Sequence, residues 1–363
     1  MPDAANEPVN IFHHTLRRGG GKERYALALA GALRRLGRQV TFYCMEAEKE
    51  AAASVGVEVR LLPVPKRPRK LQDYRFHRQV QAARRSAVGV EIGLSRVAVR
   101  DVHVSGGTHR GHLASARKFC GPFDCLRIWL ERKAYGEARV IVAHSDLLAK
   151  QLVSLYGMSK SKVRTLYAPV DDRFLPPRIS ASRPELRTRF GFPPDQAVFL
   201  FPSSGHGRKG LTPVLKAVGA YPGQARVFVA GKAECRAASC GYLGYVENLA
   251  EAYYAADFTI LGSYYEPFGL VGPESLLCGT RLVFEENIGC LAAVREDYVI
   301  PFSVWDESSI RGAVQKAIAL FKAGAHRDVD ASKALKYDPS PLVHARAILR
   351  FLAEAPEPRE QRA

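Results

Sequence analysis

Two carboxylates eight residues apart, Glu266 and Glu274, flank the junction between a predicted strand at 258–261 and a helix. Pro273 is tolerated only in the first turn of a helix, so we expect the helix to start near Phe268, with Glu266 in the preceding turn. A ligand could approach main-chain N–H groups there, those of Phe268, Gly269 and Leu270. We therefore predict a ligand site, although acidic residues also serve as ordinary charges at a helix N-terminus.

A second loop places two adjacent cations, Arg208 and Lys209, between glycines. It follows a predicted strand at 198–202 and precedes a predicted helix at 211–220. Arginine can bind a phosphate with two parallel hydrogen bonds, and lysine acts as a point charge. Because cations are unfavourable at a helix N-terminus, a diphosphate site that includes Gly207 explains this pair better than two ordinary surface charges.

A third glycine-containing loop, residues 16–24, lies between a predicted strand at 9–13 and a helix at 23–36. Gly20 and Gly21 would let the main chain pass close to an anionic ligand at the start of that helix. The spacing fits neither a dinucleotide fingerprint nor a Walker loop. A turn that merely requires glycine is the structural alternative.

The chain alternates short β-branched runs with amphipathic helical stretches, which predicts parallel sheets covered on both faces. The other predicted strands span 40–44, 57–64, 90–94, 99–104, 140–144, 163–166, 225–230, 281–284 and 298–302. A Pro- and Ser-containing stretch at 170–184 separates two such series. We expect an α/β fold of two doubly wound domains, residues 1–172 and 173–338, with ligands beyond the carboxyl ends of their strands.

The motif Glu266-x7-Glu274, with Pro-Phe-Gly-Leu after its first glutamate, resembles the signature of the retaining GT-B glycosyltransferases of family 4. The Gly207–Gly210 loop and Gly20-Gly21-x-Glu23-Arg24 resemble the same family, and the likeness runs from Val9 to about Leu352. Within the family it is greatest to the α-glucosyltransferases that act on the first heptose of the lipopolysaccharide core. The resemblance implies two Rossmann-like domains facing a central cleft. The first would be the acceptor side, with a helix at 339–353 packing back on it, and the second would bind the nucleotide-sugar.

Site roles follow from the resemblance by position. Glu266 would hold sugar hydroxyls and Glu274 the ribose, while Arg208 and Lys209 would bind the diphosphate. His109 matches a histidine near the reactive carbon of the donor. The remaining donor-binding positions are Gly20, Gly21, Arg173, Gly207, Phe268, Gly269 and Leu270. The chain departs from the family at Gly107, where relatives often have Asp, at Gly272-Pro273 and at Arg281.

The resemblance implies transfer of a hexose, glucose from UDP-glucose, to a glycolipid or oligosaccharide in lipopolysaccharide core synthesis. No third carboxylate stands out for a covalent sugar intermediate, which favours same-face attack with retention. Protein cations would serve the leaving group, so we expect no metal and no other cofactor. The alternatives are another cell-surface glycan, a GT-B epimerase or phosphorylase, and a basic nucleic-acid-binding protein. A nucleic-acid-binding protein would require aromatic residues interleaved with Lys and Arg, or a helix-turn-helix, and the sequence shows neither pattern.

Composition sets the broad class. With 363 residues, 47% hydrophobic and 25% charged, the chain is too well balanced for a disordered protein and too long for a disulfide-dense miniprotein. No apolar run reaches the roughly 18 residues that span a bilayer. The first seven residues lack the features of a signal peptide, so we expect a cytoplasmic location. The odd number of cysteines, seven, favours free thiols, and the pairs Cys120/Cys125 and Cys235/Cys240 make poor zinc motifs.

Net charge is uneven along the chain. Residues 1–172 carry 30 basic and 16 acidic side chains, whereas the remainder carries 23 and 20. Nine cations fall between residues 60 and 85: Arg60, Lys66, Arg67, Arg69, Lys70, Arg75, Arg78, Arg84 and Arg85. A solvated face is the alternative to an anionic partner. Because the excess is confined to the acceptor half, we expect peripheral attachment to the inner face of the cell membrane and a phosphorylated glycolipid acceptor.

Overall fold

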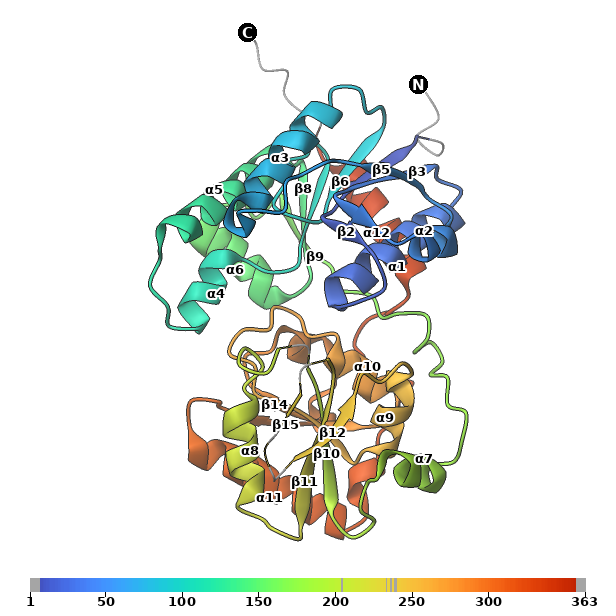
Figure 1. Ribbon diagram of the computed structural model, residues 1–363, viewed down its shortest axis with the longest axis vertical. Helices are drawn as coiled ribbons and strands as arrows, with labels where there is room; N and C mark the ends of the chain where they lie inside the picture. The colour runs from blue at the N-terminus through green and yellow to red at the C-terminus, as the bar shows by residue number, and fades with distance from the viewer. Residues whose placement is uncertain (1–6, 204, 233, 236, 238–239, 357–363) are drawn as a thin grey trace. The chain divides into compact units, whose positions relative to one another are not determined.

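The computed structural model describes residues 7–356 except 204, 233, 236, 238 and 239. The chain forms two compact units, each an α/β structure (Figure 1). Unit 1 runs to Asp171 and resumes at Pro339, and unit 2 spans Asp172–Asp338. The predicted α/β class with two parallel sheets is therefore confirmed. The expectation about a signal peptide concerns residues 1–6, which lie outside the described part of the chain, and Glu7.

Unit 1 contains a parallel sheet with the strand order β5-β3-β1-β6-β7-β8-β9. Its strands are β1 (Val9–Phe12), β3 (Val40–Cys44), β5 (Glu58–Leu61), β6 (Val90–Gly93), β7 (Val102–Ser105), β8 (Val140–Ala143) and β9 (Val163–Thr165). A separate short parallel pair joins β2 (Thr15–Leu16) to β4 (Glu46–Ala47). All residues of the central strands are buried, including the polar Asn10, Glu91 and His103, so both faces of the sheet are covered.

Helices cover both faces of this sheet. They are α1 (Gly21–Arg35), α2 (Lys49–Val55), η1 (Arg69–Leu71), α3 (Gln72–Ala83), α4 (His109–Ser115), α5 (Pro122–Glu137), α6 (Asp146–Tyr156) and α12 (Pro341–Glu354). Side chains of α1 and α12 share one core with Val140 and Val142 of β8. The alternate residues Ile141 and Ala143 pack with α5 and α6 on the opposite face. Because successive strand residues point to opposite faces, both faces of β8 are covered.

The C-terminal helix α12 belongs to unit 1. Ala345, Ile348 and Leu352 enter the core that α1 and the central strands form. At its N-terminal end the hydroxyl of Tyr25 on α1 lies 3.0 Å from Nε2 of His344. The chain thus returns to its first unit after completing the second.

Unit 2 has a parallel sheet with the order β12-β11-β10-β13-β14-β15. Its strands are β10 (Ala197–Pro202), β11 (Ala225–Ala230), β12 (Cys240–Gly244), β13 (Phe258–Leu261), β14 (Arg281–Glu285) and β15 (Val299–Phe302). Its helices are α7 (Arg183–Phe190), α8 (Leu211–Gly219), α9 (Leu249–Ala255), α10 (Val271–Leu277), η2 (Gly289–Ala293), η3 (Glu296–Tyr298), α11 (Glu307–Lys322) and η4 (Ala325–Arg327).

Both sheets reverse their strand order at an inner position. In unit 1 the reversal lies between β1 and β6, and in unit 2 between β10 and β13. Loops that leave the carboxyl ends of two such strands run to opposite sides and open a crevice there, where α/β proteins bind ligands. The loops after β1, β10 and β13 are those that carry the glycine-containing motifs.

Two further expectations can be compared with the structure. Cys235 and Cys240, five residues apart in sequence, form a disulfide with their Cα atoms 6.9 Å apart, so the prediction of free thiols is wrong for this pair. The remaining cysteines are free thiols. Within the described residues, no helix combines the length and apolar character needed to cross a bilayer.

Candidate active site

The loops after β10 and β13 touch each other at the switch point of unit 2. Gly210, the N-cap of α8, has φ +70°, and a Cβ on it would lie 1.9 Å from the carbonyl oxygen of Gly262. Only glycine fits this close approach of two main chains. The amide of Tyr264 also donates to the carbonyl of Arg208 at 3.1 Å. The cation-bearing loop is thereby fixed against the carboxylate-bearing loop.

Arg208 and Glu266 form an ion pair across these loops. Nη1 of Arg208 donates to Oε2 of Glu266 at 2.9 Å and to the carbonyl of Tyr265 at 2.9 Å. The arginine side chain is 43% exposed and the glutamate 16%. A guanidinium has five N–H donors, so Nε and Nη2 keep three that make no hydrogen bond to the described residues. The pair therefore orients Arg208 while leaving donors for an anionic ligand.

Lys209 is buried beside the end of β10. Its Nζ donates to the carbonyl oxygen of Pro202 at 2.8 Å. Burial of an ammonium group is unfavourable unless hydrogen bonds or an opposite charge compensate it. Lys209 thus lies at the carboxyl end of a strand next to the switch point, where α/β proteins bind ligands.

The loop before α10 differs from the prediction in one respect. We expected the helix to start near Phe268, but it starts at Val271. Gly269 adopts φ +89° and so interrupts helical geometry, and its carbonyl then accepts from Gly272 at 3.0 Å to close the first turn. The amides of Gly269 and Leu270 donate no hydrogen bond to the described residues. They remain donors that a polar ligand could use.

Glu274 lies on α10 and is buried. Its Oε2 accepts a hydrogen bond from the hydroxyl of Tyr253 on α9 at 3.1 Å. The two glutamates of the motif are thus in different settings: Glu266 is in an accessible loop and Glu274 is within the packed unit. This difference agrees with separate roles for the two carboxylates.

In unit 1, His109 is the first residue of α4, directly after the loop that leaves β7. Its Nε2 lies 2.7 Å from Oδ1 of Asp124, and its amide donates to Oε2 of Glu131 at 2.9 Å. The amide of Gly121 and the neighbouring His109 lower the pKa of Asp124 below its ordinary value. Asp124 is therefore a carboxylate that accepts from the imidazole at neutral pH.

Two further histidines follow β1 at the switch point of unit 1. Nδ1 of His13 lies 2.8 Å from the hydroxyl of Ser95, and Nε2 of His14 lies 3.2 Å from Asp73. Burial, and the neighbouring His14 and Lys22, lower the pKa of His13 to about 3. Burial outweighs the attraction of Asp73 and lowers the pKa of His14 to about 4. Both rings are therefore neutral at physiological pH.

The other predicted positions are distributed over the two units. Gly20 and Gly21, both exposed, form the N-cap and first residue of α1. Gly207 is exposed in the loop before α8, and Arg173 is exposed in the turn that begins unit 2, where its carbonyl accepts from Arg178. The structure thus brings together Arg208, Glu266 and the loop at 268–270. His109, Gly20 and Gly21 belong to unit 1, and each unit is described by itself.

Sequence reasoning missed the residues around His109. Asp124 and Glu131 come from α5, which we had not predicted as a helix. One signal was available: Gly121-Pro122-x-Asp124 is a helix start, because proline suits the first helical position and Asp124 accepts from the Gly121 amide at 2.9 Å. Within the described residues, no cluster of three or more His, Cys, Asp or Glu side chains could hold a metal ion.

Comparison with known proteins covers both units. A family model described as Glycosyltransferase Family 4 matches residues 19–174, and one described as Glycosyl transferases group 1 matches residues 182–328. A probable transglycosylase of Burkholderia thailandensis is 41% identical over 353 residues, which cover 96% of this chain and 97% of the relative. A D-inositol 3-phosphate glycosyltransferase of Mycolicibacterium smegmatis is 28% identical over 269 residues, 67% of this chain and 61% of the relative.

Solved structures show the same architecture. WaaG, a glycosyltransferase involved in lipopolysaccharide biosynthesis, superposes with a TM-score of 0.74 at 17% identity, over 95% of each chain. HepE of Anabaena, solved with UDP-glucose, superposes with a TM-score of 0.69 at 14% identity, over 96% of this chain and 98% of that one. At these identities the likeness shows the fold, which is GT-B.

Proposed function

The chain belongs to glycosyltransferase family 4 and is a retaining glycosyltransferase that uses a nucleotide-sugar, and we propose that it transfers glucose from UDP-glucose to a glycolipid or oligosaccharide of the lipopolysaccharide core. The observation that carries the proposal is the ion pair between Arg208 and Glu266 at the switch point of unit 2. It couples a phosphate-binding cation to a carboxylate suited to sugar hydroxyls.

In this proposal the diphosphate binds the remaining donors of Arg208 and the ammonium group of Lys209. Charge accumulates on the diphosphate as the bond to the sugar breaks, and preorganised cations stabilise that charge more in the transition state than in the ground state. Glu266 orients the sugar from its loop and Glu274 binds the ribose. The proposal also assigns His109 to the reactive carbon of the donor, and Gly20, Gly21, Arg173 and Gly207 to donor binding.

The choice of UDP-glucose and of a lipopolysaccharide acceptor draws on two structural relatives. HepE was solved with UDP-glucose, and WaaG is involved in lipopolysaccharide biosynthesis. The 41% identical relative is named a probable transglycosylase. The alternatives to be tested are therefore a glycan as the donor and another cell-surface glycan as the acceptor. A nucleic-acid-binding protein would leave the two glutamates and the loop cations without a role.

A thermal-shift screen tests the donor, because a ligand that binds the folded protein raises the melting temperature by mass action. We expect UDP and UDP-glucose to raise it more than GDP, ADP or their sugars. Incubation with UDP-glucose and a core oligosaccharide should then release UDP and form an α-linked product. Transfer from a glycan with no response to any nucleotide would contradict the proposal.

We also propose that transfer needs no divalent metal, because protein cations serve the leaving group. Full transfer after treatment with EDTA is the expected result. Loss of transfer that magnesium or manganese restores would show that the diphosphate is bound through a metal ion instead.

Attachment to an anionic membrane surface is a further part of the proposal. Most of the cations between residues 60 and 85 are exposed around η1 and α3, although Arg84 instead pairs with the buried Glu91 at 2.9 Å. Two exposed aromatic side chains of α5, Phe123 and Trp129, lie near η1 and α3, and Phe119 in the loop before α5 is 99% exposed. Nζ of Lys70 lies 4.6 Å from the centre of the Phe123 ring, so the two groups share one surface.

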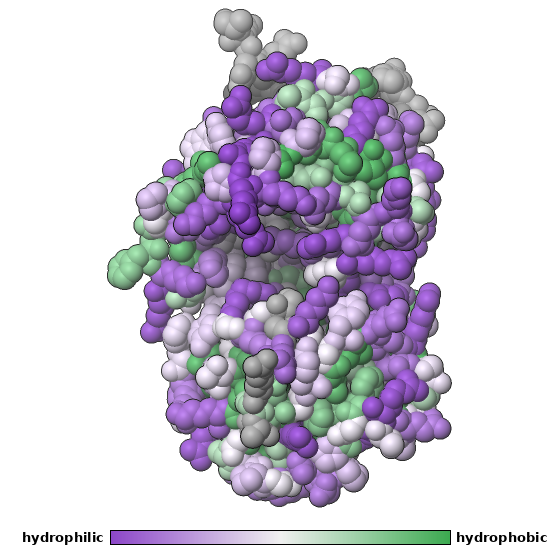
Figure 2. All heavy atoms as spheres, in the orientation of Figure 1, coloured by the Kyte–Doolittle hydropathy of each residue, from purple (hydrophilic) through white to green (hydrophobic). Residues whose placement is uncertain are grey.

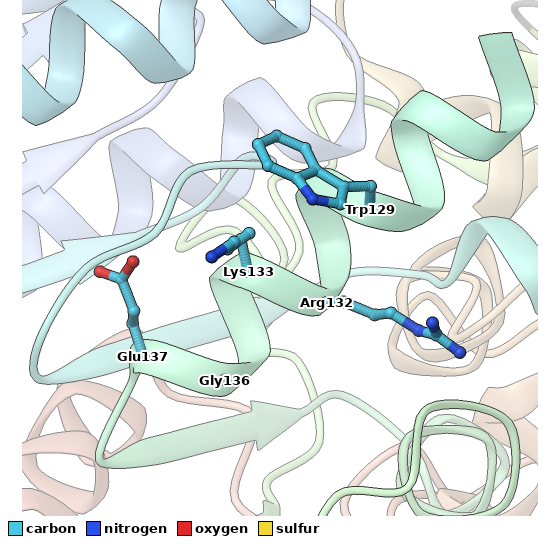
Figure 3. Close-up of a pocket in the computed structure, with 5 residues that line it drawn as sticks. All are labelled: Trp129, Arg132, Lys133, Gly136 and Glu137. Atoms are coloured by element: carbon cyan, nitrogen blue, oxygen red, sulfur yellow. The ribbon is translucent and has the colours of Figure 1, made fainter.

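This surface combines charge with apolar anchors. Trp129, Lys133 and Glu137 point to one side of α5 and line a surface pocket of about 360 Å³ (Figure 3). Elsewhere, hydrophilic side chains dominate the face of the molecule shown in Figure 2, with small hydrophobic patches between them. Each Lys or Arg near an anionic leaflet contributes about 1 kcal/mol, and aromatic rings are suited to the headgroup level.

The chain has only two tryptophans, one in each unit, which permits a direct test. In the Trp305→Phe protein, Trp129 should be quenched by brominated anionic vesicles, less so by neutral ones, and the effect should fade as salt rises. In the Trp129→Phe control, Trp305 should be unaffected. Equal, negligible binding to both kinds of vesicle would indicate a soluble acceptor.

A further inference from the structure

Side chains satisfy the first three amides of α4. The amide of His109 donates to Glu131 at 2.9 Å, that of Arg110 to the hydroxyl of Tyr156 at 3.2 Å, and that of Gly111 to the hydroxyl of Thr108 at 3.1 Å. Such amides lack partners within their own helix. The helices α5 and α6, together with the N-cap Thr108, therefore fix the start of α4, and the first residue there is His109.

Glu131 is the buried centre of this arrangement. Its Oε1 accepts from Nε of Arg96 at 2.9 Å, and its Oε2 accepts from Tyr156 as well as from the amide of His109. Burial and the nearby Glu131 raise the pKa of Tyr156, so its hydroxyl stays protonated and donates. A buried carboxylate with this many donors is compensated and holds its partners in one geometry.

Asp124 holds the ring of the same histidine. It precedes Glu131 by seven residues, two turns of α5, so both carboxylates face α4 from one side of the helix. Oδ2 of Asp124 accepts from the Gly121 amide at 2.9 Å, which leaves Oδ1 to accept from Nε2 of His109 at 2.7 Å. In a neutral imidazole this places the hydrogen on Nε2 and the lone pair on Nδ1. Nδ1 has no hydrogen-bond partner among the described residues.

We propose that Asp124 and Glu131 are positioning residues for His109, which hold its main chain and its ring so that Nδ1 accepts a hydrogen bond from a hydroxyl group of the bound substrate. This inference rests on the proposed function. It differs from a purely structural α4–α5 contact, because two carboxylates on one helix face act on a single residue, one on its main chain and one on its ring.

A double-mutant cycle tests the proposal in the full chain. Displacement of a substrate-contacting group by about 1 Å can reduce a rate by up to roughly 100-fold, so we expect Asp124→Ala to lower kcat/KM at least tenfold. In the His109→Ala background the same change should have no further effect, because Asp124 acts through His109. Glu50→Gln is the control: it alters an exposed carboxylate of α2, a helix of the same unit that contains none of His109, Asp124 and Glu131.

A second readout does not require transfer. Imidazole nitrogen signals of ¹⁵N-histidine-labelled protein should show His109 in the Nε2–H form, and Asp124→Asn or Asp124→Ala should give a mixture of both forms. The pH profile of kcat/KM should also move in these variants. The other titratable or charged groups near the pair are Arg127, 3.5 Å from Asp124, His112, whose ring centre is 6.1 Å from that of His109, and the neighbouring thiols Cys120 and Cys125.

Two outcomes would overturn the inference: equal losses from Asp124→Ala with and without His109, or an unchanged tautomer signal in both Asp124 variants. The Glu131→Gln variant should have a lower kcat/KM, but its His109 tautomer signal should match that of the wild type. Glu131 holds the main chain of His109 rather than its ring. If the protein transferred no sugar from any nucleotide, the proposed function would fail, and the nitrogen signals would still decide whether Asp124 positions the ring.

Discussion

The two units share the strand order around the switch point but differ in the side chains that they present there. In unit 2 the loops after β10 and β13 present an ion pair of Arg208, which is partly exposed, with Glu266, which is mostly buried. In unit 1 the corresponding loop after β1 presents His13 and His14, which burial keeps neutral. The same backbone arrangement thus provides charge in one unit and uncharged hydrogen-bonding groups in the other.

This difference extends through the units. Eight of the ten histidines belong to unit 1, and most of the net positive charge lies on that unit's residues. Both units also bury ion pairs, Asp257 with Arg187 in unit 2 and Glu91 with Arg84 in unit 1. The exposed cations between residues 60 and 85 belong to unit 1. In the proposed function, unit 2 stabilises the leaving group and unit 1 recruits the acceptor, so one fold class serves both roles.

Among these predictions, mild acid should have the largest effect, and it should lower the stability of unit 1. Burial lowers the pKa of His103 to about 4 and that of His144 to about 3, as it does for His13. The unfolded chain protonates near pH 6.5, so it binds more protons than the folded one between pH 6.5 and 4. Stability therefore falls with falling pH, by about 1.4 kcal/mol per pH unit for each such histidine.

Variants with a single tryptophan can measure the acid-induced unfolding of each unit separately. Fluorescence of Trp129 in unit 1 should report unfolding at a higher pH than that of Trp305 in unit 2. His144→Phe should weaken the pH dependence, because Nε2 of His144 has no hydrogen-bond partner among the described residues. Coincident transitions of both reporters would remove the contrast between the units.

Glu266→Gln should have the next largest effect, a loss of transfer of about 100-fold or more, if the carboxylate acts on the sugar in the transition state. UDP affinity should change little, since Arg208 retains its bond to the carbonyl of Tyr265. Glu286→Gln, which alters an exposed carboxylate beyond β14, is the control. Steady-state kinetics and calorimetric titration with UDP separate the two effects, and an equal fall in both would contradict the assignment.

Arg208→Ala should weaken UDP binding by about 10- to 100-fold, the effect of losing a charge-assisted hydrogen bond of roughly 1.5–3 kcal/mol. Lys216→Ala removes a lysine of α8 that instead pairs with Glu307 at 2.6 Å, and it should leave binding unchanged. Calorimetric titration with UDP measures the affinity of both variants. Unaltered affinity in folded Arg208→Ala protein would remove the diphosphate role from this arginine.

The smallest effect concerns Glu274. Tyr253→Phe removes its hydrogen bond from Tyr253 and should reduce stability by about 1 kcal/mol without preventing UDP binding. Glu274→Gln keeps the shape but should weaken UDP binding as well, if the carboxylate holds the ribose. Melting temperature and UDP affinity measured on both variants separate structure from binding. Identical behaviour of the two variants would make Glu274 a structural residue.

Prediction from sequence succeeded where a short run of residues by itself indicates a buried strand. Every predicted strand has a counterpart, from β1 to β15, because continuous β-branched runs reflect burial on both faces. It missed the helices α2, α4, α5, α7 and α9, the short strands β2 and β4, and β12, which contains two glycines. The segment that becomes α5 exposes Phe123 and Trp129 and buries Glu131, so its pattern of apolar residues does not reveal its buried face.

By itself, the sequence determined the fold class, the loops that bear glycine, Arg208 and Glu266, and the uneven charge, since each is a property of neighbouring residues. Only the tertiary structure decided which groups meet. Arg208 and Glu266 are 58 residues apart, and His109 meets Asp124 and Glu131 across 15 and 22 residues. These contacts exist because parallel strands bring their carboxyl ends to one edge and because α5 packs beside α4, and neither relation is encoded in local spacing.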